Sequence, residues 1–383
     1  MDYFLTEEQK MIRDLARQIA DEKIRPVAAE YDEKEEFPWP VLKTIAESDL
    51  CGVYIEEQYG GTGGGATELC LVTEEFSKAC GGIAVSYAAS ALGAYPIILY
   101  GSDEQKKKYL PDIASGKKLA AFAITEAGAG SDASAVSTTA KKEGDSYVLN
   151  GVKQWITNGG EAETYTVIAM TDKTKGSRGA TAFIVEKGTP GFEFGKKEKK
   201  LGIRASATRE LIFTNCKVPK ENVIGKEGLG FIVAMKTFDK SRPGIGAQAV
   251  GIAQGALDHA IKYAKERVQF GKPVSSFQGI QFMLADMGTQ TEAARALVYS
   301  AAKLVDSGAK DVSKMSAMAK LFASDVAMKV TTDAIQVFGG YGYMRDYPVE
   351  KYMRDAKITQ IYEGTNQIQR SVIASELIKE TLK

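Results

Sequence analysis

The side chains that most often perform catalysis in proteins are scarce in this sequence of 383 residues. It has a single histidine, His259, and four cysteines without CxxC or Cys/His ligand spacing, at positions Cys51, Cys70, Cys80 and Cys216. A metal site built from histidines is therefore impossible, and a Ser-His-Asp triad would depend on one residue. We predict no metal site. Any catalysis must come from carboxylates, hydroxyls, cations or a bound cofactor.

Charge and hydropathy exclude other classes of function. Lys plus Arg and Asp plus Glu both number 49, so the net charge is zero and the basic excess of a general nucleic-acid binder is missing. A local basic patch could still hold one phosphorylated ligand. Residues 1–8 lack the regions of a signal peptide, and no run approaches the ~20 apolar residues that span a bilayer. We expect a bacterial cytoplasmic protein with reduced thiols and no membrane span.

Three consecutive parts of the chain differ in their periodicity, and single cores stop growing well below this length. We predict an α+β fold with an N-terminal α-helical domain over residues 1–118, a middle antiparallel β domain over 119–230 and a C-terminal helical bundle over 231–383. In the first part, Thr6 and Gln9 fit a capping box before a helix. The glycine-rich run 59–65 follows no evident strand, which argues against a nicotinamide-binding fingerprint.

The middle part alternates with a period near two. Asn150-Gly151 between two apolar runs predicts a type I′ hairpin, and residues 164–170, 180–186 and 210–213 are further strands. The domain should be a barrel or a pair of packed sheets. In the last part, apolar residues recur at helical spacing over 245–265, 277–307, 312–338 and 355–382, the last interrupted near Glu363-Gly364. Four helices with short connections predict a four-helix bundle.

Six motifs in this order and spacing resemble the acyl-CoA dehydrogenase family, and the resemblance covers essentially the whole chain. They are AITEAGAGSD (123–132), QWITNGG (154–160), RVQFGKP (267–273), QVFGGYG (336–342), RDAKI (354–358) and IYEGTNQ (361–367). The resemblance implies the acyl-CoA dehydrogenase fold and an FAD-dependent flavoprotein oxidoreductase of fatty acid metabolism. Such an enzyme converts an acyl-CoA to the 2-enoyl-CoA by removing a proton from Cα and a hydride from Cβ.

By this resemblance Glu363 is the catalytic base, and flavin N5 accepts the hydride. The N–H of Glu363 and a ribityl hydroxyl would stabilise the developing charge on the thioester oxygen. Burial should raise the pKa of Glu363 toward neutrality, which makes it a stronger base. Some members carry the base at the position of Ser241, which cannot play that role. Judged alone, Glu363 would equally fit a solvated glutamate at a helix break.

The resemblance also assigns binding residues. The FAD-binding positions of the same subunit are Phe122, Ile124, Thr125, Ser131, Trp155, Thr157, Thr365 and Gln367, and those reaching FAD from a neighbouring subunit are Arg267, Phe270, Gln278, Gln336 and Gly340. The substrate-binding positions are Ser131, Asp239, Arg242, Tyr362 and Gly364. Simpler readings stay open for some of them: Trp155 as a core tryptophan, Arg267 as a helix C-terminal cation, and Asp239 with Arg242 as a local ion pair.

The resemblance further implies a homotetramer, arranged as a dimer of dimers, with acyl-CoA as substrate and electron-transferring flavoprotein as electron acceptor. The segment 86–92 resembles the helix that closes the acyl pocket and is small and uncharged. It disfavours a dicarboxylic acyl group, and its alanines leave a branched or cyclic group open. The chain overall looks most like short-chain members and residues 238–243 look like medium-chain ones, so we expect a short- to medium-chain acyl group. Two alternatives remain: an acyl-CoA oxidase that uses oxygen, and a non-catalytic flavin-binding scaffold.

Overall fold

The computed structural model describes residues 5–381 and shows a helical part, a sheet and a second helical part in chain order. The first part contains six helices: α1 (Glu7–Ile19), α2 (Ala28–Lys34), α3 (Trp39–Glu47), α4 (Ala66–Ala79), α5 (Gly81–Tyr100) and α6 (Asp103–Ala114). The predicted capping box is present, since Gln9 N–H donates to Thr6 Oγ1 at 3.2 Å and Thr6 N–H donates to Gln9 Oε1 at 3.1 Å. These bonds satisfy backbone donors at the start of α1.

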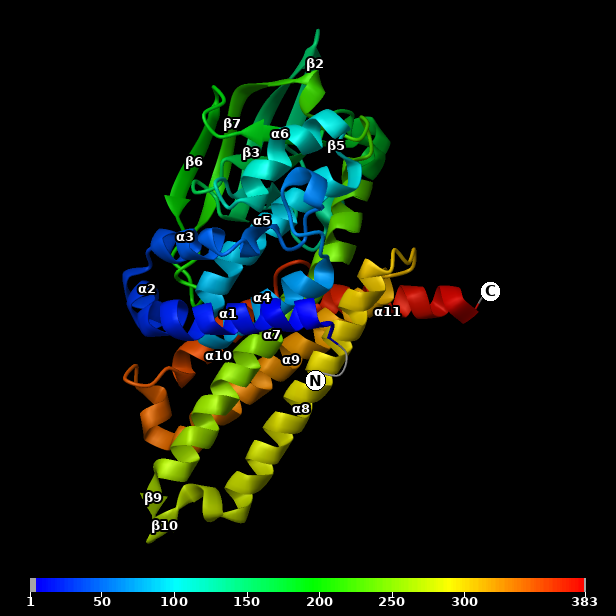
Figure 1. The fold of residues 1–383 in the computed structure, drawn as a ribbon. Coiled ribbons are helices and arrows are strands. Elements are labelled where there is room, and N and C mark those ends of the chain that lie inside the picture. Colours follow the sequence, from blue (N-terminus) through cyan, green and yellow to red (C-terminus); the bar gives the residue numbers. More distant parts are fainter. Residues whose placement is uncertain (1–4, 382–383) are drawn as a thin grey trace.

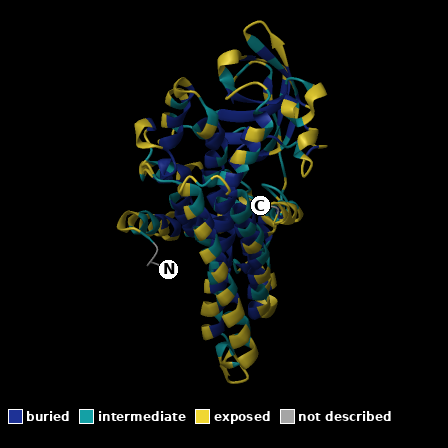
Figure 2. Cartoon of the chain, turned by 90° about the vertical axis from the view of Figure 1, so that its right-hand side faces the viewer, coloured by how far each residue is buried: buried dark blue, intermediate teal, exposed yellow. Residues whose placement is uncertain are grey.

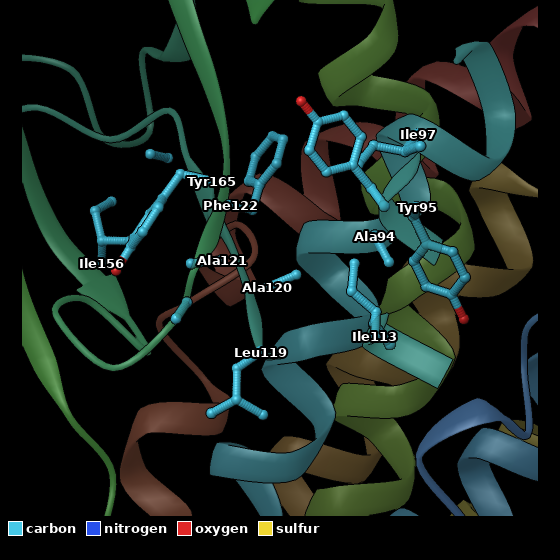
Figure 3. Close-up of a cluster of buried hydrophobic side chains, with 14 of the residues drawn as sticks. Ala94, Tyr95, Ile97, Ile113, Leu119, Ala120, Ala121, Phe122, Ile156 and Tyr165 are labelled. Carbon is cyan, nitrogen blue, oxygen red and sulfur yellow. The ribbon is translucent and has the colours of Figure 1, made fainter. Parts of the chain in front are cut away.

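Helix α5 forms the centre of this part. By length and composition it is apolar enough to cross a membrane, but 78% of that apolar window is buried inside the protein, which is typical of a core helix. Figure 3 shows part of this core, where side chains of α5 and α6 meet those of the first strand and Tyr165. The same hydrophobic cluster continues into the sheet, so the helices α1–α6 and the sheet share one core.

The sheet has eight strands in the order β6-β7-β3-β2-β4-β5-β8, with β1 added beside β4. They are β1 (Ala120–Ala123), β2 (Thr139–Glu143), β3 (Ser146–Thr157), β4 (Thr164–Met170), β5 (Ala180–Glu186), β6 (Phe192–Lys197), β7 (Thr208–Pro219) and β8 (Val223–Ile224). Antiparallel pairing predominates, as predicted. The exceptions are β1, which runs parallel to β4, and a single parallel pair between β2 and β4.

The predicted hairpin turn at Asn150-Gly151 is wrong. Both residues lie inside β3, at an irregularity in its pairing with β7, and the turn between β2 and β3 is instead at Gly144-Asp145. Gly151 is needed for close approach, because a Cβ on it would lie 2.5 Å from Thr138 Oγ1. The strong local turn preference of this dipeptide is overridden by pairing of β3 with a strand on each side.

The C-terminal part contains three long helices that run side by side in Figure 1, α7 (Gly230–Glu266), α8 (Gln278–Asp306) and α9 (Ser313–Phe338). The predicted fourth helix is two helices, α10 (Val349–Thr359) and α11 (Asn366–Thr381), separated at Glu363-Gly364. A short helix, η10 (Gly339–Tyr343), follows α9, and a small hairpin of β9 (Val268–Gln269) and β10 (Lys272–Pro273) joins α7 to α8. This part has its own core.

Figure 2 shows that burial is uneven along the long helices. The middle parts of α7 and α9 are largely buried, whereas the end that carries the β9–β10 hairpin is largely exposed. Helix α7 begins at Gly230, well before the predicted start at Ile245, and its first turns lie beside the sheet. The junction of α5, the sheet, α7 and the α10–α11 loop is therefore the place where all three parts of the chain meet.

Candidate active site

A cavity of about 340 Å³ lies at this junction. Its walls come from α5, the strand ends of β1 and β3, the loop 130–134, the start of α7 and the α10–α11 loop. The structure thus brings together residues predicted from distant motifs, since the cavity is lined by Phe122, Ile124, Thr125, Ser131, Trp155, Thr157, Arg242, Tyr362, Glu363 and Gly364. Aliphatic and aromatic side chains form most of the remaining wall.

Glu363 lies at the wall of this cavity on a strained loop. Its backbone has φ +51° and that of Gly364 has φ +90°, two consecutive left-handed residues. A Cβ on Gly364 would also approach Gln369 Nε2 to 2.7 Å. Non-glycine residues adopt this conformation at a cost of order ~1–3 kcal/mol, and such strain clusters at functional sites. Contacts of the surrounding residues must therefore stabilise the strained backbone at Glu363.

The side chain of Glu363 is half-buried, and among the described residues its carboxylate has one hydrogen-bond partner. Ser241 Oγ, from α7, donates to Glu363 Oε2 at 2.5 Å. Burial raises the pKa of Glu363 to about 7, against the hydrogen bond from Ser241 and the nearby charges of Arg242 and Lys320, which lower it. A carboxylate with a pKa near neutrality is matched to proton abstraction at physiological pH. Ser241 and Glu363 are 122 positions apart, and the family resemblance marks Ser241 only as an alternative position of the base, so the hydrogen bond itself was not predicted.

The backbone N–H of Glu363 is available to a ligand. Within residues 5–381 no hydrogen bond from this N–H is formed, whereas the carbonyls of Glu363 and Gly364 both accept from Gln369 Nε2, at 3.0 and 2.9 Å. An unpaired amide beside a carboxylate can stabilise negative charge on an oxygen while the carboxylate takes a proton.

Helix α7 supplies two of the predicted substrate-binding residues, and they behave differently. Arg242 lines the cavity, and its buried Nε has no partner among the described residues. Asp239 does not line the cavity: it accepts from Ser313 Oγ at 2.5 Å and pairs with Arg242 Nη1 at 3.3 Å. The local ion pair is thus present, and of the two residues only Arg242 also lines the cavity.

The sheet side of the cavity carries hydroxyl donors and an indole. The hydroxyls of Thr125, Ser131 and Thr157 form no hydrogen bond within the part of the chain that the structure describes. Trp155 has φ +55° and is 56% exposed, so it is not a core tryptophan. An exposed aromatic face beside unpaired hydroxyls fits a planar ligand with hydrogen-bonding edges, such as the isoalloxazine of a flavin.

Two further predicted residues follow Glu363 but do not line the cavity. Thr365 caps α11, since its Oγ1 accepts from Ile368 N–H at 3.3 Å. Gln367 is exposed on the first turn of α11. Neither position is brought into the cavity by the single chain.

The residues predicted to reach FAD from a neighbouring subunit also lie away from the cavity of their own chain: Arg267, Phe270, Gln278, Gln336 and Gly340. The β9–β10 hairpin, with Phe270 at its tip and 92% exposed, is at the far end of the long helices in Figure 1. Arg267 follows the last residue of α7, and its guanidinium lies 5.3 Å from the ring centroid of Tyr341, next to Gly340. We call these five residues the distal cluster; all are exposed except Arg267, which is half-buried.

Comparison with protein-family models covers nearly the whole chain. The N-terminal domain model of acyl-CoA dehydrogenases matches residues 6–117, the middle domain model matches 121–216 and the C-terminal domain model matches 228–378. Among curated relatives, the short-chain specific acyl-CoA dehydrogenase of Clostridium acetobutylicum is 50% identical over 99% of this chain and 100% of its own. Acryloyl-CoA reductase (NADH) of Anaerotignum propionicum is 51% identical over 99% and 96%.

Solved structures agree with this assignment. Butyryl-CoA dehydrogenase from Megasphaera elsdenii matches with a TM-score of 0.96 and 49% identity, over 99% of this chain and 100% of the other. A chain from work on the electron transferring flavoprotein of Acidaminococcus fermentans and flavin-based electron bifurcation matches with a TM-score of 0.96 and 53% identity, over 98% and 99%. An acyl-CoA dehydrogenase complexed with FAD from Bacillus anthracis matches at 0.92 and 37%, over 99% and 69%. The chain therefore belongs to the acyl-CoA dehydrogenase family, whose members are FAD-dependent oxidoreductases.

Proposed function

We propose that this chain is an FAD-dependent acyl-CoA dehydrogenase that desaturates short-chain acyl thioesters to their 2-enoyl-CoA products. The observation that carries the proposal is the state of Glu363. It combines a carboxylate whose pKa is raised to about 7 with an unpaired N–H, on a strained loop at the wall of a mostly apolar cavity. A solvated glutamate at a helix break would need none of these features.

In this proposal Glu363 performs the proton step. Its carboxylate takes the proton from Cα of the thioester, and its N–H donates to the thioester oxygen, where negative charge develops. Ser241 holds the carboxylate through Oε2, which leaves Oε1 to meet the substrate. Bound FAD would supply the acceptor for the hydride that leaves Cβ. The apolar walls exclude water, which strengthens both electrostatic interactions.

The proposed cofactor site has two parts. The hydroxyls of Thr125 and Thr157, the indole of Trp155 and the Ser131 loop would hold the flavin ring and the start of its chain. The distal cluster, with Arg267 and Phe270, would hold the diphosphate and adenine of FAD bound to a neighbouring subunit, because a planar guanidinium can bind two diphosphate oxygens at once. Thr365 and Gln367 would complete the site near the flavin. This division requires at least a dimer, and the family resemblance extends the proposal to a homotetramer built as a dimer of dimers.

The acyl pocket is proposed to take a short, uncharged chain. The α5 wall of the cavity is formed by small and aliphatic side chains, among them Val85, Ala88, Ala89 and Leu92, together with Tyr95, and it carries no cation to pair with a second carboxylate. Relatives at about 50% identity that act on short-chain or butyryl substrates support this choice over medium-chain, branched or cyclic groups. One methylene changes discrimination by only ~1–3 kcal/mol, so substrates of neighbouring lengths should also react.

Electron-transferring flavoprotein is the proposed electron acceptor, supported by the structural neighbour from the Acidaminococcus fermentans work. The relative with acryloyl-CoA reductase activity favours a second assignment for the same site, reduction of a short 2-enoyl-CoA. Removal and return of the same two hydrogens use the same residues, so the direction depends on the electron partner.

An anaerobic titration tests the proposal. Purified protein is mixed with acyl-CoAs from butyryl through octanoyl, with isovaleryl, glutaryl and a cyclohexenyl thioester included, while the absorbance of oxidised flavin is followed. Bleaching by butyryl-CoA, with less by longer or charged members, is the expected result. Bound flavin that no member reduces would contradict the proposal and favour the non-catalytic scaffold. Rapid reoxidation of the reduced protein by oxygen would favour the oxidase.

A further inference from the structure

A fully buried lysine lies beneath the loop of Glu363. Lys320, in α9, has no exposed surface, and within residues 5–381 no carboxylate lies within ion-pair distance of its ammonium. Burial of an uncompensated ammonium is costly, so its neighbours must supply acceptors. Its Nζ donates to the carbonyl of Gly364 at 2.8 Å and to Asn366 Oδ1 at 2.9 Å. Both acceptors belong to the segment that immediately follows Glu363.

The same segment is anchored at several other points. Asn366 Nδ2 donates to Ser324 Oγ at 2.9 Å and to Asp325 Oδ1 at 2.7 Å, both in α9. Gln369 donates to the carbonyls of Glu363 and Gly364. Glu363 and Gly364 both have a positive φ, and that of Gly364 is the larger. Of the anchoring residues on α9 named here, only Lys320 bonds directly to this pair, at the carbonyl of Gly364. A strained backbone persists only where its surroundings over-determine it.

Charge adds a second effect. The groups that face Glu363 are Ser241 and Arg242 from α7 and Lys320 from α9, while Tyr95 of α5 and the adjacent Tyr362 sense its charge. Lys320 in turn faces Glu363, Arg242 and Asp325. Burial lowers the pKa of Lys320 to about 7, and Glu363 and Asp325 oppose that shift. A cation beside Glu363 favours its carboxylate form, the form that accepts a proton.

We propose that Lys320 is a positioning residue for Glu363: its two hydrogen bonds fix the backbone that presents the base, and its protonated form favours ionisation of the base. This inference rests on the proposed function of Glu363 as the base. Lys320 touches neither the cavity nor the substrate, so it acts only through the loop.

The test compares Lys320→Met, Lys320→Arg and Lys329→Met with the natural protein, all as purified FAD-loaded protein. Lys329→Met is the matched control, because it removes one exposed charge from the same helix. Two readouts are measured against pH: the rate of flavin bleaching by butyryl-CoA, and exchange of the α-protons of acetyl-CoA with D2O. Acetyl-CoA has no Cβ, so its exchange reports the proton step without hydride transfer.

Lys320→Met is expected to bind FAD and acyl-CoA normally but to lose tenfold or more in both rates. The pH at which each rate is half-maximal should move upward, because removal of the cation raises the pKa of the base. Lys320→Arg should restore the pH midpoint more than the rate, and Lys329→Met should match the natural protein. A purely structural role for Lys320 would lower thermal stability without moving the pH midpoint.

Natural rates and an unshifted midpoint in Lys320→Met would overturn the inference. Should that variant not fold, Asn366→Ala takes its place, since it removes one acceptor and the link to Ser324 while the charge stays. It should lower both rates with an unshifted midpoint, and natural rates there would overturn the positioning role. If the natural protein neither bleaches nor exchanges, the proposed function itself fails, which separates the two outcomes.

Discussion

Ser241 and Glu363 are joined by a hydrogen bond of 2.5 Å, although they come from α7 and from the loop between α10 and α11. The bond ties the candidate base to a helix whose next residue, Arg242, also lines the cavity. It consumes one carboxylate oxygen and fixes the side-chain torsions of Glu363. A serine that cannot itself be the base therefore affects both where the base points and when it is ionised.

Substitution Ser241→Ala should move the pH midpoint of flavin bleaching upward. The hydroxyl favours the carboxylate form of Glu363, and a hydrogen bond to a charged group contributes ~1.5–3 kcal/mol, or about one to two pKa units. From a pKa of about 7, a shift of one unit leaves roughly a tenth of the base ionised at pH 7. Stopped-flow bleaching by butyryl-CoA from pH 6 to pH 9 measures this. Ser241→Thr keeps the hydroxyl and should retain the natural midpoint; an identical midpoint in Ser241→Ala would show that the bond has no functional weight.

Replacement of the base should separate binding from chemistry. Glu363→Gln should keep FAD and bind butyryl-CoA, yet lose roughly 10²–10⁴-fold in the bleaching rate, the usual contribution of general base catalysis. Spectral titration with the substrate measures binding, and bleaching in the same sample measures the chemistry. Full-rate bleaching by this variant would show that another group takes the α-proton.

The same substitution should also change stability with a defined pH dependence. Burial raises the pKa of Glu363 to about 7 from an ordinary value of 4.5, so the folded state holds the proton more tightly than the unfolded chain. Stability linked to this group is complete below about pH 4.5 and is lost as the pH rises through about 7. At pH 8, Glu363→Gln should thus be more stable than the natural protein by up to roughly 3 kcal/mol and should unfold at a higher temperature. At pH 4, where the glutamate is protonated in the folded state, the variant should unfold no more easily than the natural protein.

A side chain at position 364 should disturb the loop. Gly364→Ala introduces a Cβ at φ +90° and within 2.7 Å of Gln369 Nε2, so it should cost about 1 kcal/mol or more and lower the bleaching rate at least tenfold. Gly308→Ala is the matched control, since that glycine also has a positive φ, +71°, but open space around its Cβ position. It should lower stability alone. Equal effects of both substitutions on the rate would contradict a special role of the Gly364 backbone.

A buried ion pair supports the sheet side of the cavity. Lys153 Nζ donates to Glu126 Oε1 at 2.7 Å and to the carbonyl of Ile124, a cavity residue, at 3.0 Å. Burial alone would raise the pKa of Glu126, but Lys153 and hydrogen bonds from Ser137 and Thr138 lower it to about 2. The stability contributed by this carboxylate is present above about pH 4.5 and is lost as the pH falls through about 2.

Removal of one partner of this pair should be worse than removal of both. Glu126→Gln leaves the buried Lys153 without its counter-charge, and such changes cost ~3–5 kcal/mol. The double variant Glu126→Gln with Lys153→Met should recover part of that loss. Urea unfolding at pH 7, followed by tryptophan fluorescence, gives the free energies. If the double variant is less stable than Glu126→Gln by as much as Lys153→Met alone destabilises the natural protein, the two residues are not coupled.

The helices and most strands could be predicted because their signals are local. Apolar spacing located α8 and α9 closely, and short apolar runs located β4 and β5. The prediction of a turn at Asn150-Gly151 was wrong because pairing of β3 with β2 and β7 overrides the local turn preference. A short stretch of sequence does not contain both partner strands. Pairing that depends on residues far along the chain is invisible to periodicity.

The candidate site shows the same limit. Motif resemblance assigned Glu363, Trp155, Thr125 and Thr157, and the structure places them around one cavity. Lys320 could not be singled out, because it lies in a helix of mixed small and charged residues where a lysine is usually solvated. Its burial and its bonds to the Glu363 loop arise only when α9 packs against α10 and α11. The Glu126–Lys153 pair is likewise a product of tertiary contact.

The exposed β9–β10 hairpin predicts that two different inactive variants of this protein can complement each other. If Arg267 of one chain completes a cofactor site whose base is the Glu363 of another, Glu363→Gln and Arg267→Ala damage opposite halves of a shared unit. Each homogeneous variant should be inactive or flavin-poor. A hybrid of the two contains one doubly damaged site and one in which both residues are intact. Co-expression of the two inactive alleles with random pairing should therefore leave about a quarter of the sites intact and restore bleaching to roughly a quarter of the natural value. If each site were confined to one chain, every mixture would stay inactive.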